Sequence, residues 1–413
     1  MTASVVLLAV GIVGTLRPPA RLPNGAVPVL AAAVAIGLPL VGVGTIHLHD
    51  VLRSVRPLVA PLLFLLLATP LASMLDRLGV FEAAASLATG RRLAVGCWVL
   101  AAVTVAALNL DTAVILLTPL YVSIARRSGI DPLALAAQPA ILACLASSGL
   151  PVSNLTNLIA TEQGSIGAGT LVRLLGPATV AATAAGYAGW RLAFRRSVLV
   201  PTAVGQVPVG AGLVGAADDH PGRAGDGSVG RPLLVGGVVL TVLLGGFALG
   251  RVVGVPPWVV VATVDIGLLV LGARPRMSRG PVETAAAACG LAVLAAAVAG
   301  HVDVAGLMGG GVGWLAELRI IGVGAGVASL TNNLPALLVL LPAAVGDRAV
   351  AALLLGLNLG PAVIVTGSLS GLLWLDAARR AGLRVGALDY TRFGVIAGVP
   401  AIVVAAAALL VVR

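Results

Sequence analysis

The amino-acid sequence predicts an all-α, polytopic membrane protein with about 10–12 transmembrane helices. Apolar residues make up 59% of the 413 positions, charged residues only 10%, and the mean hydropathy is +1.08. An ordinary soluble domain carries about 25% charged and about 45–50% apolar residues. Water would not tolerate the apolar surface of a soluble chain with this composition. A soluble enzyme, a nucleic-acid-binding protein and a disordered chain are therefore excluded.

The apolar segments fall into two sets, and a helix needs about 20 such residues to span a bilayer. The first set covers residues 2–16, 25–46, 57–75, 93–108, 112–125, 132–150 and 168–190. The second covers residues 232–250, 256–273, 282–300, 312–330, 334–346, 349–375 and 393–412. Several segments are too short to cross alone, and others are interrupted by Gly, Pro or Asn. The sequence therefore predicts re-entrant pieces beside complete spans.

The segments predict three parts: an N-terminal transmembrane repeat (1–190), a cytoplasmic linker loop (191–231) and a C-terminal transmembrane repeat (232–413). The linker is rich in Gly, Asp and Pro and has no apolar period, which is typical of a flexible loop. The alternative is a small regulatory module.

The basic residues predict membrane orientation rather than nucleic-acid binding. All 26 are Arg, and aromatic residues, which would stack on bases, make up only 3%. Pairs such as Arg126-Arg127, Arg195-Arg196 and Arg379-Arg380 lie between apolar segments. Under the positive-inside rule they anchor cytoplasmic loops. We therefore expect a multi-pass protein of the inner, cytoplasmic membrane.

Each half contains two polar motifs embedded in apolar sequence. The first motifs are Asn109-Leu-Asp111-Thr112 and Thr331-Asn332-Asn333-Leu-Pro335, and aligning them pairs Asp111 with Asn333. The second motifs are Ser153-Asn154-Leu-Thr156-Asn157 and Asn358-Leu-Gly360-Pro361, with Thr366-Gly367-Ser368 following. Interrupted segments at corresponding positions are typical of inverted-repeat secondary transporters. Irregular backbone at membrane depth is tolerated where it lines a cavity.

The amides and hydroxyls of these motifs are the candidate solute-binding groups. They are Asn109, Asn154, Thr156, Asn157, Thr331, Asn332, Asn333, Asn358, Thr366 and Ser368. Such side chains can bind a polar solute near the bilayer midplane without a fixed counter-charge. The alternative is that they form ordinary hydrogen bonds between helices.

Asp111 is the candidate proton-coupling residue, because it is the only acid inside a polar motif. A charged Asp at the bilayer centre costs roughly 2.5–3.5 kcal/mol on insertion scales. A carboxyl group under that cost can alternate between protonated and ionised forms. The alternative is an Asp that caps a broken helix. Asp265 is a second acid at membrane depth, but it has no polar neighbours in sequence and has either a coupling or a structural role.

The sequence gives no indication of catalysis, a metal or a cofactor. Cys97, Cys144 and Cys289 are far apart, which predicts buried thiols rather than a zinc site or disulfides. No phosphate-binding loop, nucleophile elbow or HExxH motif is present. We therefore expect no enzyme and no cofactor, with a membrane-embedded enzyme or scaffold as the least supported class. ATP-driven transport would require an ATPase partner.

The polar motifs resemble the arsenite/antimonite efflux permease family of the ion-transporter superfamily, over nearly the whole chain. The resemblance rests on Asp111 with Ile115-Leu-Leu-Thr118-Pro119, Ser153–Asn157, Thr331–Pro335, Leu359–Pro361, and Gly367-Ser368-Leu369 with Leu372-Leu-Trp374-Leu. It implies two inverted repeats, each with a re-entrant hairpin and a broken helix. It also implies a cytoplasmic-membrane antiporter that exports arsenite or antimonite in exchange for protons and confers arsenical resistance.

The same fold allows other cargoes. Relatives in the superfamily include sodium-coupled symporters of dicarboxylates or other anions and sodium/proton antiporters, and their sites carry similar Ser-Asn-Thr motifs. The expected partners are the lipid bilayer, a small inorganic or organic solute, and a proton or sodium ion. An ATPase partner and a homodimer are further options, and no nucleic acid is expected.

Overall fold

The computed structural model describes residues 2–16, 22–23, 25–37, 48–87, 92–195, 230–275, 279–299, 303–309 and 313–412. These residues are helical or connect helices, and none of them forms a β-strand. The all-α prediction is confirmed. Most of the predicted linker lies outside the described residues. Its flanking helices, α10 (Ala168–Ala193) and α12 (Gly230–Val253), extend slightly into the predicted range.

Six helical stretches are long and apolar enough to cross a membrane alone. Within the described residues they are Val51–Arg77, Ala168–Ala193, Gly230–Phe247, Gly280–Val298, Trp314–Thr331 and Ala387–Val411. Further apolar helices of 10–17 residues precede them or lie between them. The protein is therefore polytopic, and segments too short to cross alone lie beside complete spans, as the sequence predicts.

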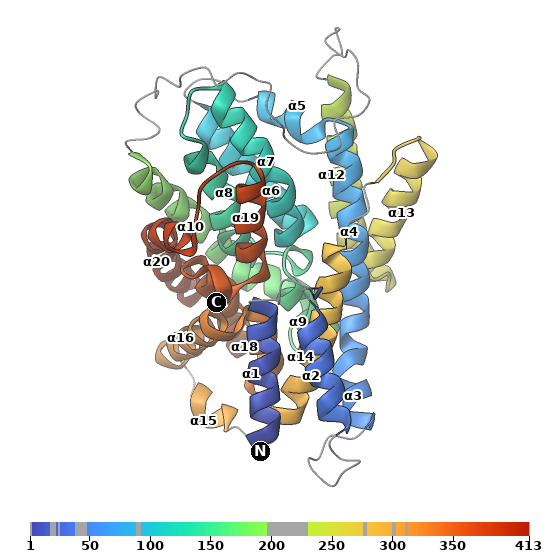
Figure 1. Cartoon of the computed structure of the whole chain (residues 1–413), viewed down its shortest axis with the longest axis vertical. Coiled ribbons are helices and arrows are strands. Elements are labelled where there is room, and N and C mark those ends of the chain that lie inside the picture. The colour runs from blue at the N-terminus through green and yellow to red at the C-terminus, as the bar shows by residue number, and fades with distance from the viewer. Residues whose placement is uncertain are drawn as a thin grey trace.

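A group of long and short helices forms one side of the molecule (Figure 1). They are α1 (Thr2–Leu16), α2 (Ala26–Gly37), α3 (Leu48–Val55), α4 (Val59–Arg77), α5 (Val80–Ser86), α12, α13 (Pro257–Val270) and α14 (Gly280–Ala299). Helix α14 packs against α1, α2 and α3, and α13 packs along α4. In Figure 1, α3 lies at the lower end of α4 and α5 at its upper end.

The remaining helices occur in two successions of the same order. The first is α6 (Leu93–Leu108), α7 (Leu110–Arg127), α8 (Pro132–Leu145), α9 (Leu155–Glu162) and α10. The second is α16 (Trp314–Thr331), α17 (Asn333–Leu340), α18 (Asp347–Leu359), α19 (Leu369–Arg380) and α20 (Ala387–Val411), and the short helix α15 (Val304–Met308) precedes it. In each, two helices form a hairpin, two more are separated by a loop, and a long helix follows. The predicted single segment 349–375 is thus two helices, α18 and α19.

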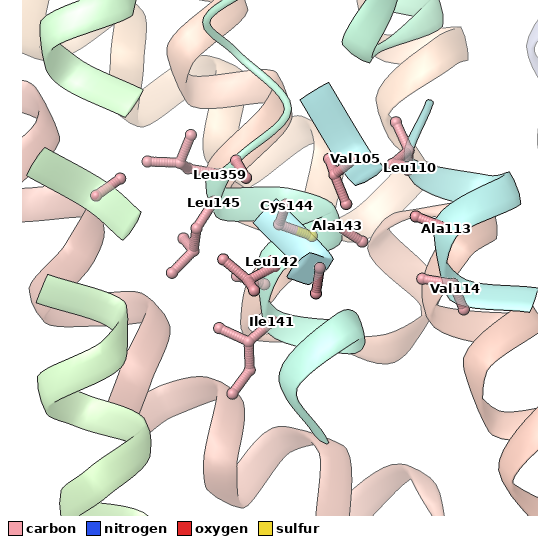
Figure 2. Packing of buried hydrophobic residues seen from close by; sticks show 14 of the residues in the cluster. Val105, Leu110, Ala113, Val114, Ile141, Leu142, Ala143, Cys144, Leu145 and Leu359 are labelled. Carbon is pink, nitrogen blue, oxygen red and sulfur yellow. The ribbon is translucent and has the colours of Figure 1, made fainter. Parts of the chain in front are cut away.

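The core is centred on α8, of which nearly every residue is buried. Figure 2 shows Ile141–Leu145 of α8 between Val105 on α6, Ala113 and Val114 on α7, and Leu359 on α18. Burial on all sides explains why α8 has no polar stripe. The hairpin and both interrupted helices are therefore packed on a common apolar centre.

Two buried tryptophans bond to α8, and the second of them, on α19, connects the two successions. Trp190 on α10 donates its indole N–H to the carbonyl of Ala134 at 2.7 Å, and Trp374 on α19 donates to Ala136 at 2.7 Å. A buried indole usually finds such a partner. Helices α10 and α20 pack closely because a Cβ at Gly189 would lie 2.6 Å from the backbone of Ala397.

Candidate functional site

Each hairpin has an asparagine at its turn, and both asparagines have a positive backbone φ angle. Asn109 has φ 98° and Asn332 has φ 86°, and among the described residues no other non-glycine has positive φ. Each side-chain Oδ1 accepts a hydrogen bond two residues ahead, from the N–H of Asp111 at 3.0 Å or of Leu334 at 3.2 Å. Asparagine tolerates this backbone better than most residues, and its side chain caps the helix that follows.

This geometry fixes the register between the halves. Asn109 corresponds to Asn332, so Asp111 corresponds to Leu334 rather than to Asn333. The sequence pairing of Asp111 with Asn333 is therefore wrong by one residue. The second half carries no acid at the position of Asp111.

One side-chain amide stabilises the loop that interrupts the first helix. Residues 146–154 separate α8 from α9, and the Nδ2 of Asn157 donates to three carbonyls of this loop. Those carbonyls belong to Ser147, Ser148 and Leu150, at 2.9, 3.2 and 3.0 Å. The amide therefore satisfies backbone groups that an interrupted helix leaves without partners.

Asn358 joins the first interrupted helix to the second. At the end of α18, its Oδ1 accepts from the hydroxyl of Thr156 at 2.6 Å and from the Nδ2 of Asn154 at 3.0 Å. Its Nδ2 donates to the Oδ1 of Asn157 at 2.8 Å. All these side chains are buried. Residues about two hundred positions apart in sequence thus form one polar network.

The second interrupted helix has a loop of equal length, residues 360–368, between α18 and α19. Ser368 caps α19 by accepting from the N–H of Gly371 at 3.2 Å, and its hydroxyl lies 2.8 Å from that of Ser370. The hydroxyl of Tyr390 donates to the carbonyl of Pro361 at 3.2 Å. Matching the loops places Ser368 opposite Asn154 and Gly371 opposite Asn157.

A small cavity lies where the two hairpins and the first interrupted helix meet. Its volume is about 50 Å³, several times the roughly 10–15 Å³ that one water requires. Its polar lining consists of Asp111, Asn154, Thr156, Thr284, Asn332 and Asn333, and leucines and alanines complete the wall. The cavity therefore combines amides, hydroxyls and one carboxyl group.

Among the described residues, Asp111 is the only charged one in this lining. It lies in the first turn of α7, and its Oδ1 is buried with no hydrogen-bond partner among the described residues. Helices α7, α9 and α17 all begin at the cavity, and helix N-termini favour electron-rich groups. The part of the lining that the structure describes contains no Arg, so a bound anion would meet no opposite charge there.

The structure gathers only part of the predicted set around the cavity. Asn154, Thr156, Asn332, Asn333 and Asp111 line it. Asn157 and Asn358 lie beside it, with their amides used in the loop network, and Asn109 forms the hairpin turn.

Three further predicted residues also take no part in the lining that the structure describes. Thr331 donates to the carbonyl of Val327 within its own helix at 2.8 Å. Ser368 caps α19, and Thr366 lies half-buried in the second loop. Solute binding by the whole set stays a prediction.

The sequence patterns did not identify Thr284 on α14 as a residue of the cavity. Its hydroxyl donates to the carbonyl of Gly280 at 2.9 Å, and it lines the cavity with Ala287, Ala288 and Leu291. A lone Thr before a run of alanines gives no sequence signal. Only the packing of α14 against α17 brings it to the site.

The other candidate groups lie away from the cavity. Asp265 is buried on α13, and its Oδ1 has no hydrogen-bond partner in the described part of the chain. Cys97 and Cys144 are buried, Cys289 is half-buried, and all three are free thiols. The described residues contain no group of three His, Cys, Asp or Glu that could hold a metal ion.

The chain is similar to known transport proteins. A family model described as "CitMHS: Citrate transporter" matches residues 1–367. An arsenical pump membrane protein of Yersinia enterocolitica is 27% identical over 418 aligned positions, covering 92% of each chain.

Proposed function

Because the chain belongs to the citrate transporter (CitMHS) family, we propose that it is a secondary active transporter that exports arsenite or antimonite in exchange for protons. It is a multi-pass membrane protein, and we place it in the cytoplasmic membrane. The proposal draws on the arsenical pump membrane protein to which the chain is similar.

The observation that carries the proposal is the charge of the central cavity. Amides and hydroxyls surround a space of about 50 Å³, and Asp111 is the only charged residue in the described lining. A small uncharged polyhydroxy solute can exchange its water contacts for these groups at little cost. A multiply charged anion would face the full desolvation cost with no opposite charge.

Arsenious acid has the required chemistry. At neutral pH it is a small, largely uncharged trihydroxy molecule whose hydroxyls donate and accept hydrogen bonds. Asn332 and Asn333 on one hairpin, and Asn154 with Thr156 on the first interrupted helix, present complementary groups. Thiol coordination is not part of the proposal, because the three cysteines are dispersed.

Asp111 supplies the proton-coupling group. Its Oδ1 is buried without a partner among the described residues, so ionisation at this depth is costly. In the proposed cycle, the carboxyl group takes up a proton from outside and releases it to the cytoplasm. The cavity then binds solute from the cytoplasm and releases it when it is next exposed to the outside.

The repeated order of helices supports alternating access. We propose that the two successions form inverted repeats, each with a re-entrant hairpin and an interrupted helix. Figure 1 shows α6 and α7 in the upper half of the molecule and α15 and α16 in the lower half. Hairpins that enter from opposite ends can expose one cavity to either side in turn.

Everted membrane vesicles test this function. When respiration acidifies the vesicle interior, we expect arsenite to accumulate inside, and a protonophore should abolish accumulation. Asp111→Asn should remove the coupling, so arsenite then equilibrates without accumulating against its gradient. Accumulation that survives both the protonophore and Asp111→Asn would contradict the proposal.

A second candidate is coupled uptake of an organic anion such as citrate, favoured by the description of the matching family. In that case a cation must enter with the anion to compensate for the missing positive side chain. Sodium-dependent uptake of labelled citrate or succinate by proteoliposomes, without arsenite transport, would support this candidate instead.

A further inference from the structure

A second, much larger cavity lies near the central one, and we call it the vestibule. Its volume is about 790 Å³. Its wall includes Arg53 and Ser54 on α3, Arg56 on the following turn, Gln163 at the end of α9, Ala296 on α14 and Leu338 on α17. No sequence motif marks it, and the proposed function does not use it.

The same three helices line both cavities. On α14, Leu291 lines the central cavity and Ala295 the vestibule; on α17, Leu334 and Leu338 do the same. Four residues of helix rise about 6 Å. Helix α9 contributes Thr156 to the central cavity and Glu162 to the vestibule. The vestibule therefore ends roughly one helical turn from the candidate solute site.

We propose that the vestibule is the outer half of the translocation path, a water-filled route with a basic mouth. This inference rests on the proposed transport function but not on the identity of the cargo. It assigns Arg53 and Arg56 to the mouth of the route. It also assigns this structure to an arrangement that faces the outside of the cell.

The orientation follows from the arginines at the opposite end. There, Arg127 forms an ion pair with Glu82 on α5 at 3.4 Å, and Arg126 donates to the carbonyl of Ala381 at 2.9 Å. The neighbouring helix ends add Arg77, Arg92, Arg379 and Arg380 to this α5 end. By the positive-inside rule it faces the cytoplasm. The vestibule adjoins α3, at the other end of α4 (Figure 1), and therefore opens outward.

The charge of the mouth follows from its side chains. Arg53 and Arg56 contribute two positive charges, and Glu162 is the only acid in the described lining. The net charge of +1 lies in a concave wall that is otherwise apolar or neutral. Such a shape concentrates the field and raises the local concentration of anions.

Cysteine accessibility tests the route independently of cargo. In a Cys289→Ala background, Ala296→Cys and Ser54→Cys place thiols in the vestibule. Both should react with a membrane-impermeant thiol reagent in right-side-out vesicles and be protected in everted ones. Ser86→Cys, exposed on α5, is the matched control and should show the reverse pattern. Val180→Cys, 71% exposed on the apolar face of α10, should react from neither side.

The outcomes separate the two proposals. Labelling of both vestibule thiols only in everted vesicles would overturn the orientation, and no labelling from either side would overturn the water-filled route. Failure of arsenite transport alone would leave the labelling pattern unchanged and would count only against the proposed function.

Reaction rates test the basic mouth. At Ala296→Cys, an anionic sulfonate reagent should react about tenfold faster, relative to a cationic reagent, than at an exposed thiol without neighbouring arginines. Arg53→Gln combined with Arg56→Gln should remove this preference while leaving the thiol accessible. An unchanged rate ratio in the double variant would overturn the role of the arginines.

Discussion

The two interrupted helices have loops of equal length that are stabilised in different ways. In residues 146–154, side-chain amides hold the backbone, because Asn157 bonds three loop carbonyls and Asn358 bonds Asn157. In residues 360–368, Gly371 replaces that asparagine, and close backbone packing replaces the amide. The comparison shows that one backbone shape can be kept by hydrogen bonds or by close contact.

Glycines make the close packing of the second loop possible. A Cβ at Gly371 would lie 2.4 Å from the carbonyl oxygen of Val365, and one at Gly394 on α20 would lie 2.2 Å from that of Ala362. A Cβ at Gly360 would meet Ala325 on α16 at 2.6 Å. The second loop is therefore packed between α16 and α20, and at these three glycine positions no side chain larger than hydrogen fits.

The first loop should be the more sensitive to loss of a single side chain. Asn157→Ala leaves the amide of Asn358 and several loop carbonyls without partners, and each such group costs about 1–3 kcal/mol. We expect a loss of roughly 3 kcal/mol or more, measured as a large drop in melting temperature of the detergent-solubilised protein. Thr161→Ala, on the same helix, removes only a bond to its own helix and should have a small effect. Equal melting temperatures for both variants would contradict this account.

The second loop should be sensitive to added volume instead. Gly371→Ala and Gly394→Ala insert a methyl group against a carbonyl oxygen, which costs about 1–3 kcal/mol in a packed core. We expect lower melting temperatures than for the wild type, assayed by fluorescence-detected gel filtration after heating. Gly176→Ala, where nothing lies within 4 Å of the new Cβ, is the control and should match or exceed wild-type stability. A stable Gly371→Ala protein would show that the loop can relax.

Equivalent substitutions in the two hairpin turns should lower stability by similar amounts, because both turns contain an asparagine at the same position. Asn109→Ala and Asn332→Ala each lose a cap and leave at positive φ a residue without the local hydrogen bond by which asparagine tolerates this backbone. The expected cost is about 1–2 kcal/mol for each. Asn109→Gly and Asn332→Gly should recover part of it, since glycine adopts this backbone freely. A glycine variant less stable than its alanine counterpart would contradict the role of the backbone.

The smallest effect is expected at Thr331, which bonds the carbonyls of Val327 in its own helix and, at 3.4 Å, of Asn332, and does not line the central cavity. Thr331→Val should shift stability by less than about 0.5 kcal/mol and keep the initial transport rate within about twofold. Asn333→Ala, two residues away but in the cavity wall, should lower that rate by tenfold or more. Similar rates for the two variants would show that the cavity is not the solute site.

The sequence predicted helix positions correctly where the pattern that determines a helix lies within the helix itself. The ranges 93–108, 168–190 and 312–330 lie close to α6, α10 and α16, because an apolar run between turn residues determines a helix by itself. The polar motifs also located both hairpin turns and both loops. The exact register failed, since Asn109 and Asn332 are matched by their backbone and not by the residues around them.

The sequence by itself determined the solvent of this protein, its helices and the positions at which they are interrupted, because composition and periodicity act over a few turns of chain. Only the tertiary structure decided which polar groups face a shared space and which are used to hold the loops. Asn358 shows the reason: its partners lie about two hundred residues away, and packing against α9 determines how its amide is used. Thr284 and the vestibule depend in the same way on the position of α14, which no local pattern encodes.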